Sequence, residues 1–153
     1  MQISEPGKYV WNDRARGIRE VGEYLTAVKQ GFVIDTARII LGGFSKGGGL
    51  AIWLTLHQLI AARGFVVLGP FLSEDELEEL SSLLATQKPA GIRGYIIAGE
   101  EDVRCLEIAR RVVDMMQAHD LPCELEIRAG LNHEYPSDFS ESVDRGLAFI
   151  EQA

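Results

Sequence analysis

The hydrophobic residues of this chain recur every three or four positions in some segments and form short unbroken runs in others. The first pattern is typical of helices with one face on a core, and it predicts helices over residues 12–31, 73–84, 103–119 and 138–150. A further segment, LAIWLTLHQLI at residues 50–60, is apolar on nearly every side. We expect this helix to be central and covered by its neighbours.

Short apolar runs that are rich in β-branched residues and show no alternation are typical of strands buried on both faces. Three segments have this character: RIILGGF at 38–44, GFVVLGP at 64–70 and RGYIIAG at 93–99. A fourth predicted strand, CELEIRA at 123–129, alternates apolar and polar residues. We expect one of its faces to meet solvent and the strand to lie at a sheet edge.

Helices and strands alternate along the chain with short connections. This order gives a parallel sheet with helices on both faces, joined by right-handed crossovers. We therefore expect one α/β domain over residues 1–153, with about four strands. Helix starts are marked by Asn12 or Asp13 and by two capping boxes, Ser73 with Glu76 and Asp138 with Glu141.

A glycine-rich stretch, GGFSKGGGL at residues 42–50, joins the first predicted strand to the covered helix. A Walker loop needs Lys-Ser or Lys-Thr after its second glycine, and a dinucleotide fingerprint needs glycines at i, i+2 and i+5; neither occurs here. Anion binding by the helix N-terminus is an unspecific alternative. Gly43 to Gly47 fits G-x-S-x-G, in which the serine stands on a sharp strand-to-helix turn with its hydroxyl exposed. Ser45 is therefore a candidate nucleophile.

A serine hydroxyl needs a base that accepts its proton, and the chain offers three histidines. His57 follows Ser45 on the same helix at a distance of about 18 Å, which is too far. His119 ends a helix, where a cation suits the carbonyl end of the helix dipole. His133 follows the last predicted strand and would share the carboxyl rim of the sheet with Ser45. We take His133 as the candidate base, although a loop histidine is often only a surface residue.

The acid that orients this base should come from the same rim, where the segment GEEDV supplies Glu100, Glu101 and Asp102. Each of these residues is also a candidate cap for the following helix, and Asp102 is the best placed of them. We favour Asp102 as the orienting acid because Ser45, Asp102 and His133 then follow the serine, acid, histidine order of α/β hydrolases.

Three segments, DTARIILGGFSKGG, IIAGEED and GLNHEYPSDF, resemble the signature regions of the carboxylesterase/phospholipase branch of the α/β-hydrolase superfamily. This branch includes acyl-protein thioesterases and is similar to dienelactone hydrolases. The resemblance implies a carboxylic ester hydrolase that forms an acyl-enzyme, needs no cofactor or metal, and acts on a small acyl ester or thioester. It implies that Ser45 is the nucleophile, His133 the general base and Asp102 the orienting acid, with the backbone N–H of Lys46 as an oxyanion donor.

The resemblance runs from about Trp11 to the C-terminus and covers the second half of the family's fold. In the family, the first half supplies further strands and a His-Gly loop with the second oxyanion donor, and this sequence contains no His-Gly dipeptide. Loss of one such donor typically costs about 10²–10³ in rate. A second hypothesis therefore stays open: a truncated, catalytically weak or inactive hydrolase half that serves as an interaction module or is a fragment.

The same resemblance places the first strand in mid-sheet, which leaves one hydrogen-bonding edge of RIIL without a partner in this chain. Because an open apolar edge promotes association, we expect either a homo-oligomer built around Ile39 to Leu41 or a missing N-terminal half that covers the strand. Residues 1–10 should supply at most one short strand, interrupted at Pro6-Gly7, so we expect them to cover the edge least well.

The composition of the chain argues against some classes of partner and indicates the cellular compartment of the protein. Hydrophobic residues make up 46% of the chain and charged residues 25%, which is typical of a globular protein and not of a disordered one. The net charge of −8 argues against nucleic acid and anionic membrane surfaces as partners. Cys105 and Cys123 lack metal-site spacing, so we expect reduced thiols. With no apolar run of membrane-spanning length and no leader pattern, we expect a cytoplasmic protein without stable membrane anchoring.

Overall fold

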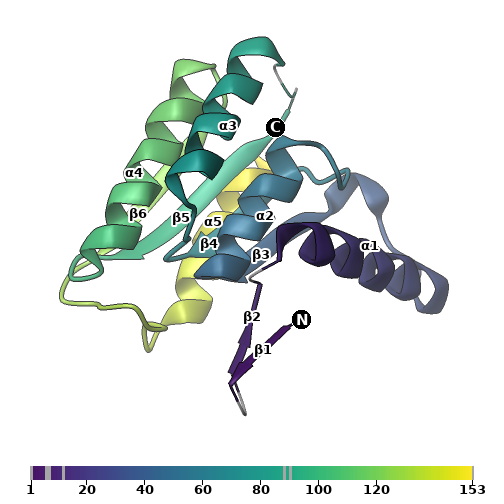
Figure 1. The fold of residues 1–153 in the computed structure, drawn as a ribbon, viewed down its shortest axis with the longest axis horizontal. Helices are drawn as coiled ribbons and strands as arrows, with labels where there is room; N and C mark the ends of the chain where they lie inside the picture. Colours follow the sequence, from purple (N-terminus) through teal and green to yellow (C-terminus); the bar gives the residue numbers. More distant parts are fainter. Residues whose placement is uncertain (1, 6–7, 12, 88, 90, 153) are drawn as a thin grey trace.

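The computed structural model describes residues 2–5, 8–11, 13–87, 89 and 91–152. The central feature of this part of the chain is a four-stranded parallel sheet in the order β3-β4-β5-β6 (Figure 1). Its strands are β3 (Ile40–Phe44), β4 (Gly64–Leu68), β5 (Arg93–Gly99) and β6 (Cys123–Arg128). The predicted α/β fold with a parallel sheet of about four strands is confirmed.

Helices cover both faces of the sheet (Figure 1). One face carries α2, α3 and α4, the opposite face carries α5, and α1 packs against α2 beside the β3 edge. A short 3₁₀ turn, Thr36–Arg38, precedes β3. The helices are α1 (Arg14–Gly31), α2 (Lys46–Leu56), α3 (Glu74–Thr86), α4 (Val103–Ala118) and α5 (Phe139–Glu151).

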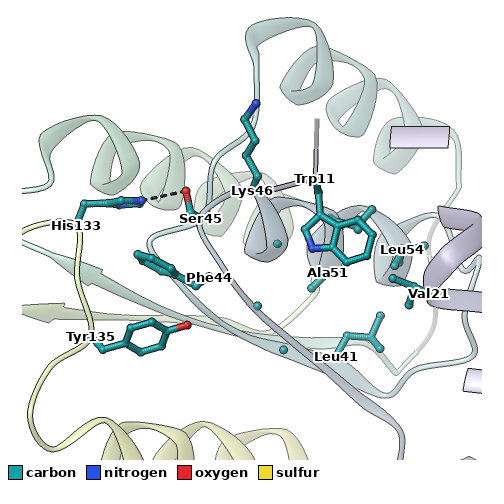
Figure 2. Close-up of a pocket in the computed structure, with 14 residues that line it drawn as sticks. Trp11, Val21, Leu41, Phe44, Ser45, Lys46, Ala51, Leu54, His133 and Tyr135 are labelled. Carbon is teal, nitrogen blue, oxygen red and sulfur yellow. Dashed lines mark hydrogen bonds between the residues drawn. The ribbon is translucent and has the colours of Figure 1, made fainter. Parts of the chain in front are cut away.

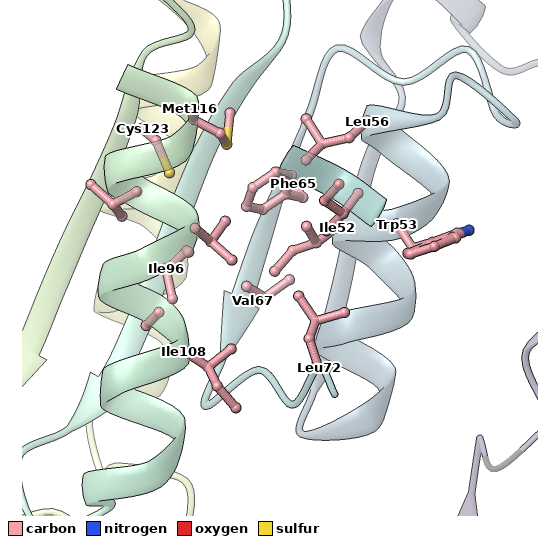
Figure 3. Packing of buried hydrophobic residues seen from close by; sticks show 14 of the residues in the cluster. Ile52, Trp53, Leu56, Phe65, Val67, Leu72, Ile96, Ile108, Met116 and Cys123 are labelled. Atoms are coloured by element: carbon pink, nitrogen blue, oxygen red, sulfur yellow. The ribbon is translucent and has the colours of Figure 1, made fainter. Parts of the chain in front are cut away.

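Successive residues of the central strands enter two different apolar layers. Phe65 and Val67 of β4 and Ile96 of β5 lie in the layer under α2, α3 and α4 (Figure 3). Val66 and Ile97 lie in the layer under α5. Every residue of β4 is buried, which explains why its sequence shows no alternation of polar and apolar residues.

Helix α2 is buried along most of its length, as predicted, but it ends at Leu56 and not at residue 60. Gln58 has a positive φ of 53°, and the Leu59 N–H donates to the Leu54 carbonyl at 3.0 Å. A left-handed residue of this kind closes a helix by satisfying its last carbonyl groups.

No helix in the described part of the chain has both the length and the apolar composition needed to cross a bilayer.

Two of the predicted helix caps form, and one does not. Asp13 accepts a hydrogen bond from the Arg16 N–H at the start of α1, and the box of Ser73 and Glu76 is complete at the start of α3. Asn12 lies outside the described residues. The box predicted for Asp138 and Glu141 is wrong: the Asp138 carboxylate makes no cap. It instead accepts two hydrogen bonds from Arg128, at 2.5 and 2.6 Å.

Strand β6 lies at the sheet edge, as predicted. Glu124 is exposed and Leu125 packs against the core, as the alternation predicts, but the expected exposure of the next two residues is reversed. The Glu126 side chain is only 13% exposed and lies under α5, whereas the apolar Ile127 is 44% exposed. The carboxylate tolerates this burial because Tyr95 and Ser142 donate hydrogen bonds to it at 2.7 and 2.8 Å. Alternation in the sequence therefore identified the strand and the orientation of its first residues, but not the burial of Glu126 or the exposure of Ile127.

The first residues form a hairpin of β1 (Gln2–Glu5) and β2 (Lys8–Val10), so the expectation of at most one short strand is wrong. This hairpin is a sheet of its own and does not pair with β3. Figure 1 shows it extending away from the helices and the main sheet. Among the described residues, β3 therefore has a strand neighbour on one side only, which is the open edge that the sequence predicts.

This open edge leads us to expect self-association through β3. Wild-type protein should sediment as an oligomer at micromolar concentration, and Gly42→Lys, at an exposed position of β3 where a Cβ would meet only the Val66 carbonyl at 3.4 Å, should shift it to monomer because a charge at a strand edge opposes pairing. Ser81→Lys, at an exposed position of α3, is the matched control and should leave the oligomer intact. A wild-type chain that sediments as a stable monomer would contradict this expectation.

Candidate active site

Ser45 occupies a sharp turn between β3 and α2. Its backbone has φ 54° and ψ −122°, a conformation that non-glycine residues rarely adopt and that is typical of strained functional turns. Hydrogen bonds hold the turn from both sides: the Ser45 N–H donates to the Leu68 carbonyl at 3.0 Å, and the Ser45 carbonyl accepts from Phe71 N–H at 2.9 Å. The turn is therefore fixed by the neighbouring strand β4 and the loop that follows it.

Glycines around Ser45 allow the backbone segments of this turn to approach each other. A Cβ atom on Gly43 would lie 2.3 Å from the Gly47 carbonyl oxygen, and one on Gly49 would lie 2.0 Å from the Phe71 carbonyl oxygen. Both separations are far below contact distance and involve backbone atoms, which cannot move aside cheaply. Close backbone approach is thus the reason why a single serine is surrounded by glycines.

Three side chains that the sequence analysis selected lie together at the carboxyl end of the sheet. His133 Nε2 is 2.9 Å from Ser45 Oγ, and His133 Nδ1 is 2.6 Å from Asp102 Oδ2 (Figure 2 shows the first contact). Ser45 follows β3, Asp102 follows β5 and His133 lies in the loop after β6. With the Nδ1–H donating to the carboxylate, Nε2 is left to accept the serine proton.

Asp102, the predicted orienting acid, and the two neighbouring glutamates have different hydrogen-bond partners. Asp102 stands at the N-cap position of α4, yet its carboxylate makes no cap and contacts His133. Glu100 Oε2 accepts a hydrogen bond from Gly130 N–H at 3.2 Å, and Glu101 N–H donates to the Leu131 carbonyl at 3.0 Å. The two glutamates thus bind the loop that carries His133, while the carboxylate of Asp102 faces the imidazole.

The other two histidines lie away from Ser45. His57, beyond the end of α2, packs against Trp53 with 4.2 Å between ring centroids, and burial lowers the pKa of its imidazole. His119 caps the C-terminal end of α4. Neither residue lines the cavity next to Ser45.

The His133 ring is held between the carboxylate and an aromatic side chain. Phe44, the residue before Ser45, stacks on the imidazole with 4.6 Å between ring centroids and an interplanar angle of 29°. Tyr135 packs against Phe44 at 4.8 Å and against Phe139 of α5 at 5.0 Å. This aromatic row connects the nucleophile strand, the histidine loop and α5. The sequence pattern did not indicate it, because Phe44 is far in the chain from His133, Tyr135 and Phe139.

Gly69, directly after β4, faces the contact between Asp102 and His133. Its φ is +46°, and a Cβ atom at this position would lie 3.3 Å from both Asp102 Oδ2 and His133 Nδ1. A side chain would therefore be strained by the backbone and would also press on the hydrogen-bonded pair. The sequence analysis took this glycine only as part of a strand.

Glu126 organises a polar network below the histidine loop. Its carboxylate accepts hydrogen bonds from Tyr95, Ser142, Arg128 and Arg145, at 2.7 to 2.9 Å for the shortest contact of each. Burial alone would raise the pKa of Glu126, but the hydrogen bonds from these four residues outweigh it and lower the pKa to about 2. Glu126 therefore remains ionised over the whole physiological range.

Arg128 and Asp138 close the base of the same loop. Arg128 is the last residue of β6 and Asp138 directly precedes α5, so their two-fold hydrogen bond joins the two ends of the loop that contains His133. The guanidinium of Arg128 lowers the pKa of Asp138. Both bonds come from one nitrogen of Arg128, Nη2, and such charge-assisted hydrogen bonds are stronger than neutral ones. The sequence analysis missed the role of both residues.

Lys46, the expected oxyanion donor, is the first residue of α2. Backbone N–H groups in the first turn of a helix point out of its N-terminus, where the helix dipole favours negative charge. The Lys46 ammonium lies 5.8 Å from the centroid of the Phe71 ring. The position next to Ser45 suits an oxyanion donor, because the N–H comes from the residue after the nucleophile.

A cavity of about 670 Å³ opens beside Ser45 and His133 (Figure 2). Its wall is mostly apolar and is formed by β3, α1, α2, the segment before α1 and the loop that carries His133, through Trp11, Val21, Leu41, Leu50, Leu54 and Tyr135. A second apolar cavity of about 300 Å³ lies beside the same strand and shares Leu41 and Tyr135 with the first. In the sequence, Trp11 marked only the start of the family resemblance, and its place at the site was not predicted.

Cys105, in the first turn of α4, is a further neighbour of the histidine that the sequence analysis missed. Its Sγ atom is 3.7 Å from His133 Nδ1. Burial, together with the Asp102 carboxylate, raises the pKa of Cys105 to about 12, so the group is a protonated thiol at neutral pH. Both cysteines are free and buried, as the expectation of reduced thiols requires.

Comparison with known proteins identifies the family to which the chain belongs. The model of the phospholipase/carboxylesterase family matches residues 15–149, which include Ser45, Asp102 and His133. The chain belongs to this family. No curated protein matches the sequence.

Solved structures share the fold of this family member. An uncharacterized protein from Bacillus cereus ATCC 10987 is 30% identical with a TM-score of 0.84, and the match covers 98% of this chain and 47% of that one. Arabidopsis thaliana SOBER1 is 14% identical with a TM-score of 0.65, covering 95% and 69%. The S-formylglutathione hydrolase FrmB from Staphylococcus aureus is 18% identical with a TM-score of 0.66, covering 85% and 58%. The chain thus spans about half the length of the Bacillus cereus protein.

The polar network under the histidine loop should make stability depend on pH. Glu126→Gln should lower the free energy of unfolding at pH 7 by about 1–3 kcal/mol, because the amide cannot replace the charge-assisted hydrogen bonds. The folded pKa of Glu126 is lowered to about 2, so its contribution is complete above the unfolded value of about 4.3 and is lost as the pH falls toward 2.

Urea denaturation at pH 7, 4 and 3 measures this difference. The gap between wild type and Glu126→Gln should narrow at the lower pH values, whereas Glu107→Gln, on the exposed side of α4, should match wild type at pH 7. A gap of the same size at every pH would show that the ionised carboxylate is not what stabilises the network.

Proposed function

We propose that this chain is a serine hydrolase of carboxylic esters, with Ser45 as nucleophile, His133 as general base and Asp102 as orienting acid. The observation that carries the proposal is the continuous contact from Ser45 Oγ through His133 to Asp102, at 2.9 and 2.6 Å. Ser45 occupies a strained turn beside an apolar cavity, and the chain is a member of the phospholipase/carboxylesterase family. A serine, an imidazole and a carboxylate in this order form the standard unit of acyl transfer.

The reaction has two halves. In the first, Ser45 Oγ attacks the carbonyl carbon while His133 Nε2 takes the hydroxyl proton, and the imidazolium then gives that proton to the departing alcohol or thiol. In the second half, water attacks the acyl-Ser45 ester with His133 again as the base, and Ser45 recovers its proton as the acid leaves. Asp102 keeps the Nδ1–H in place and stabilises the imidazolium that forms twice per cycle.

The oxyanion of each tetrahedral intermediate would accept a hydrogen bond from the Lys46 backbone N–H at the start of α2. In this class of elbow, the second donor belongs to a loop after an earlier strand. The present chain spans about half of the Bacillus cereus protein, so such a loop would have to come from a chain segment or partner that adjoins β3. Without it, turnover should be slower by about 10²–10³.

The cavity favours a small acyl ester or thioester as substrate. Its lining is mostly apolar along α1 and α2, which suits the hydrocarbon part of an acyl group, and Ser45 and His133 supply the polar end. The net charge of −8 disfavours polyanionic substrates.

A second function, that of an interaction module, is supported by two observations. The β3 edge is open, and the chain matches about half of its longer relative. A hydrolase half of this kind would serve as an interaction module with weak or no turnover. Labelling of the serine and turnover of an ester separate the two functions, because an assembled site can be activated without an efficient oxyanion hole.

A fluorophosphonate probe tests the proposed function. It should label wild-type protein, and Ser45→Ala should abolish labelling. His133→Ala should slow it by about 10²–10⁴, because no base then accepts the serine proton. His119→Ala, which removes a histidine remote from the cavity, is the matched control and should react like wild type. Intact mass and gel fluorescence measure the labelled fraction.

Equal labelling of wild type, Ser45→Ala and His133→Ala would sink the hydrolase proposal, since the probe would then report general surface reactivity. Labelling that depends on Ser45 and His133 while a p-nitrophenyl ester is not turned over would favour the interaction module. Labelling together with turnover that is lost in Ser45→Ala supports the enzyme.

A further inference from the structure

Cys105 lies beside the contact between Asp102 and His133 and has no part in the proposed hydrolysis. The carboxylate, thiol and imidazole atoms of Asp102, Cys105 and His133 all lie within 4.8 Å of one another. These three groups are the ligand types that Zn²⁺ and related ions bind. We propose that they form a binding site for a thiophilic divalent cation of the zinc class, and that the bound ion switches the candidate active site off. The inhibitory part of this inference rests on the proposed function.

The spacing of the thiol and imidazole fits a single ion. Bonds of about 2.3 Å to sulfur and about 2.0 Å to nitrogen, at a tetrahedral angle, hold these two atoms about 3.5 Å apart. The observed separation between Cys105 Sγ and His133 Nδ1 is 3.7 Å. The two atoms therefore already stand at the span that one cation requires.

The carboxylate and the imidazole would have to separate for the ion to enter. Asp102 Oδ2 and His133 Nδ1 are 2.6 Å apart, whereas two ligands of one tetrahedral ion would be about 3.3 Å apart. His133 is the group that can move, because its side chain is 37% exposed in a surface loop. Asp102 and Cys105 are three positions apart at the start of α4, so both project from the same side of its first turn.

A cation on Nδ1 would block the base by changing its tautomer. The proposed hydrolysis needs the tautomer in which the Nδ1–H donates to Asp102 and the Nε2 lone pair faces Ser45. A bound ion uses the Nδ1 lone pair, so the neutral ring carries its proton on Nε2 and cannot accept one from Ser45 Oγ. The Cys105 thiol releases its proton to solvent, and the ion is held by thiolate, carboxylate and neutral imidazole. A water molecule would complete the coordination.

Cobalt absorption tests the binding without reference to activity. Co²⁺ added to the metal-free protein should produce a sulfur-to-cobalt charge-transfer band in the near ultraviolet, and Zn²⁺ should displace it. Cys105→Ala should lose the band. Cys123→Ala is the matched control, because Cys123 is also buried but begins β6, at the opposite end of the strand from the histidine loop, so this variant should keep the band. Circular dichroism verifies that both variants are folded.

Fluorophosphonate labelling of Ser45 tests the inhibition. Saturating Zn²⁺ should slow labelling of wild type and of Cys123→Ala at least tenfold, and a chelator should restore it. Cys105→Ala, compared with its own metal-free rate, should need at least tenfold more Zn²⁺ for the same effect. The variant loses one of three protein ligands, so residual binding by Asp102 and His133 is expected to be weak.

Each outcome of these two experiments supports or overturns the cation site, the inhibition or the proposed function. A cobalt band that survives in Cys105→Ala, or no band in wild type, would overturn the site. A band that behaves as expected while Zn²⁺ leaves labelling unchanged would overturn the inhibition. If Ser45 is not labelled even without metal, the proposed function fails, and the cobalt spectra alone then decide whether the cation binds.

Discussion

The left-handed turn at Ser45 is the constraint on which the rest of the site depends. Two backbone hydrogen bonds, to Leu68 and from Phe71, hold it against β4 and the following loop. Because Gly43 and Gly49 lack side chains, the turn closes tightly and α2 packs directly onto the sheet. The serine hydroxyl is then positioned by buried backbone and not by a flexible loop, which is the condition for a preorganised nucleophile.

The parallel sheet converts this local turn into a site. The loops after β3, β5 and β6 all leave from the carboxyl ends of their strands, so Ser45, Asp102 and His133 meet although they are far apart in sequence. The meeting of these three side chains was predictable from the sequence, because it needs only the order of the elements and the positions of the motifs.

The contacts that support the three side chains were not predictable. The stacking of Phe44 on the imidazole, the closure of the loop by Arg128 with Asp138, and the approach of Cys105 depend on side-chain packing between elements. The alternation in β6 marked a strand and correctly predicted that Glu124 is exposed, but it did not predict the burial of Glu126, whose carboxylate is satisfied by hydrogen bonds under α5.

The other consequence of the fold is the open side of β3. Strand pairing, two apolar cavities and the Ser45 turn all meet along this one strand. Whatever adjoins it would extend the sheet and enclose the substrate cavity at the same time. If the chain associates through β3 and hydrolyses esters as proposed, both properties would depend on the same five residues, Ile40–Phe44, and a change in oligomeric state should alter the activity of the site.

Detection of the acyl-enzyme is the most direct test of Ser45 as the activated nucleophile. Protein mixed with an activated acyl ester and quenched within the first turnover should carry one acyl group, located by fragmentation of the tryptic peptide IILGGFSK, or of the longer peptide up to Arg63 that forms if acylation of Lys46 blocks cleavage. We predict the group on Ser45 Oγ, and its loss over time as water completes the reaction. An acyl group found on the Lys46 amine, or an adduct that forms equally fast without His133, would contradict the assignment of Ser45 as an activated nucleophile.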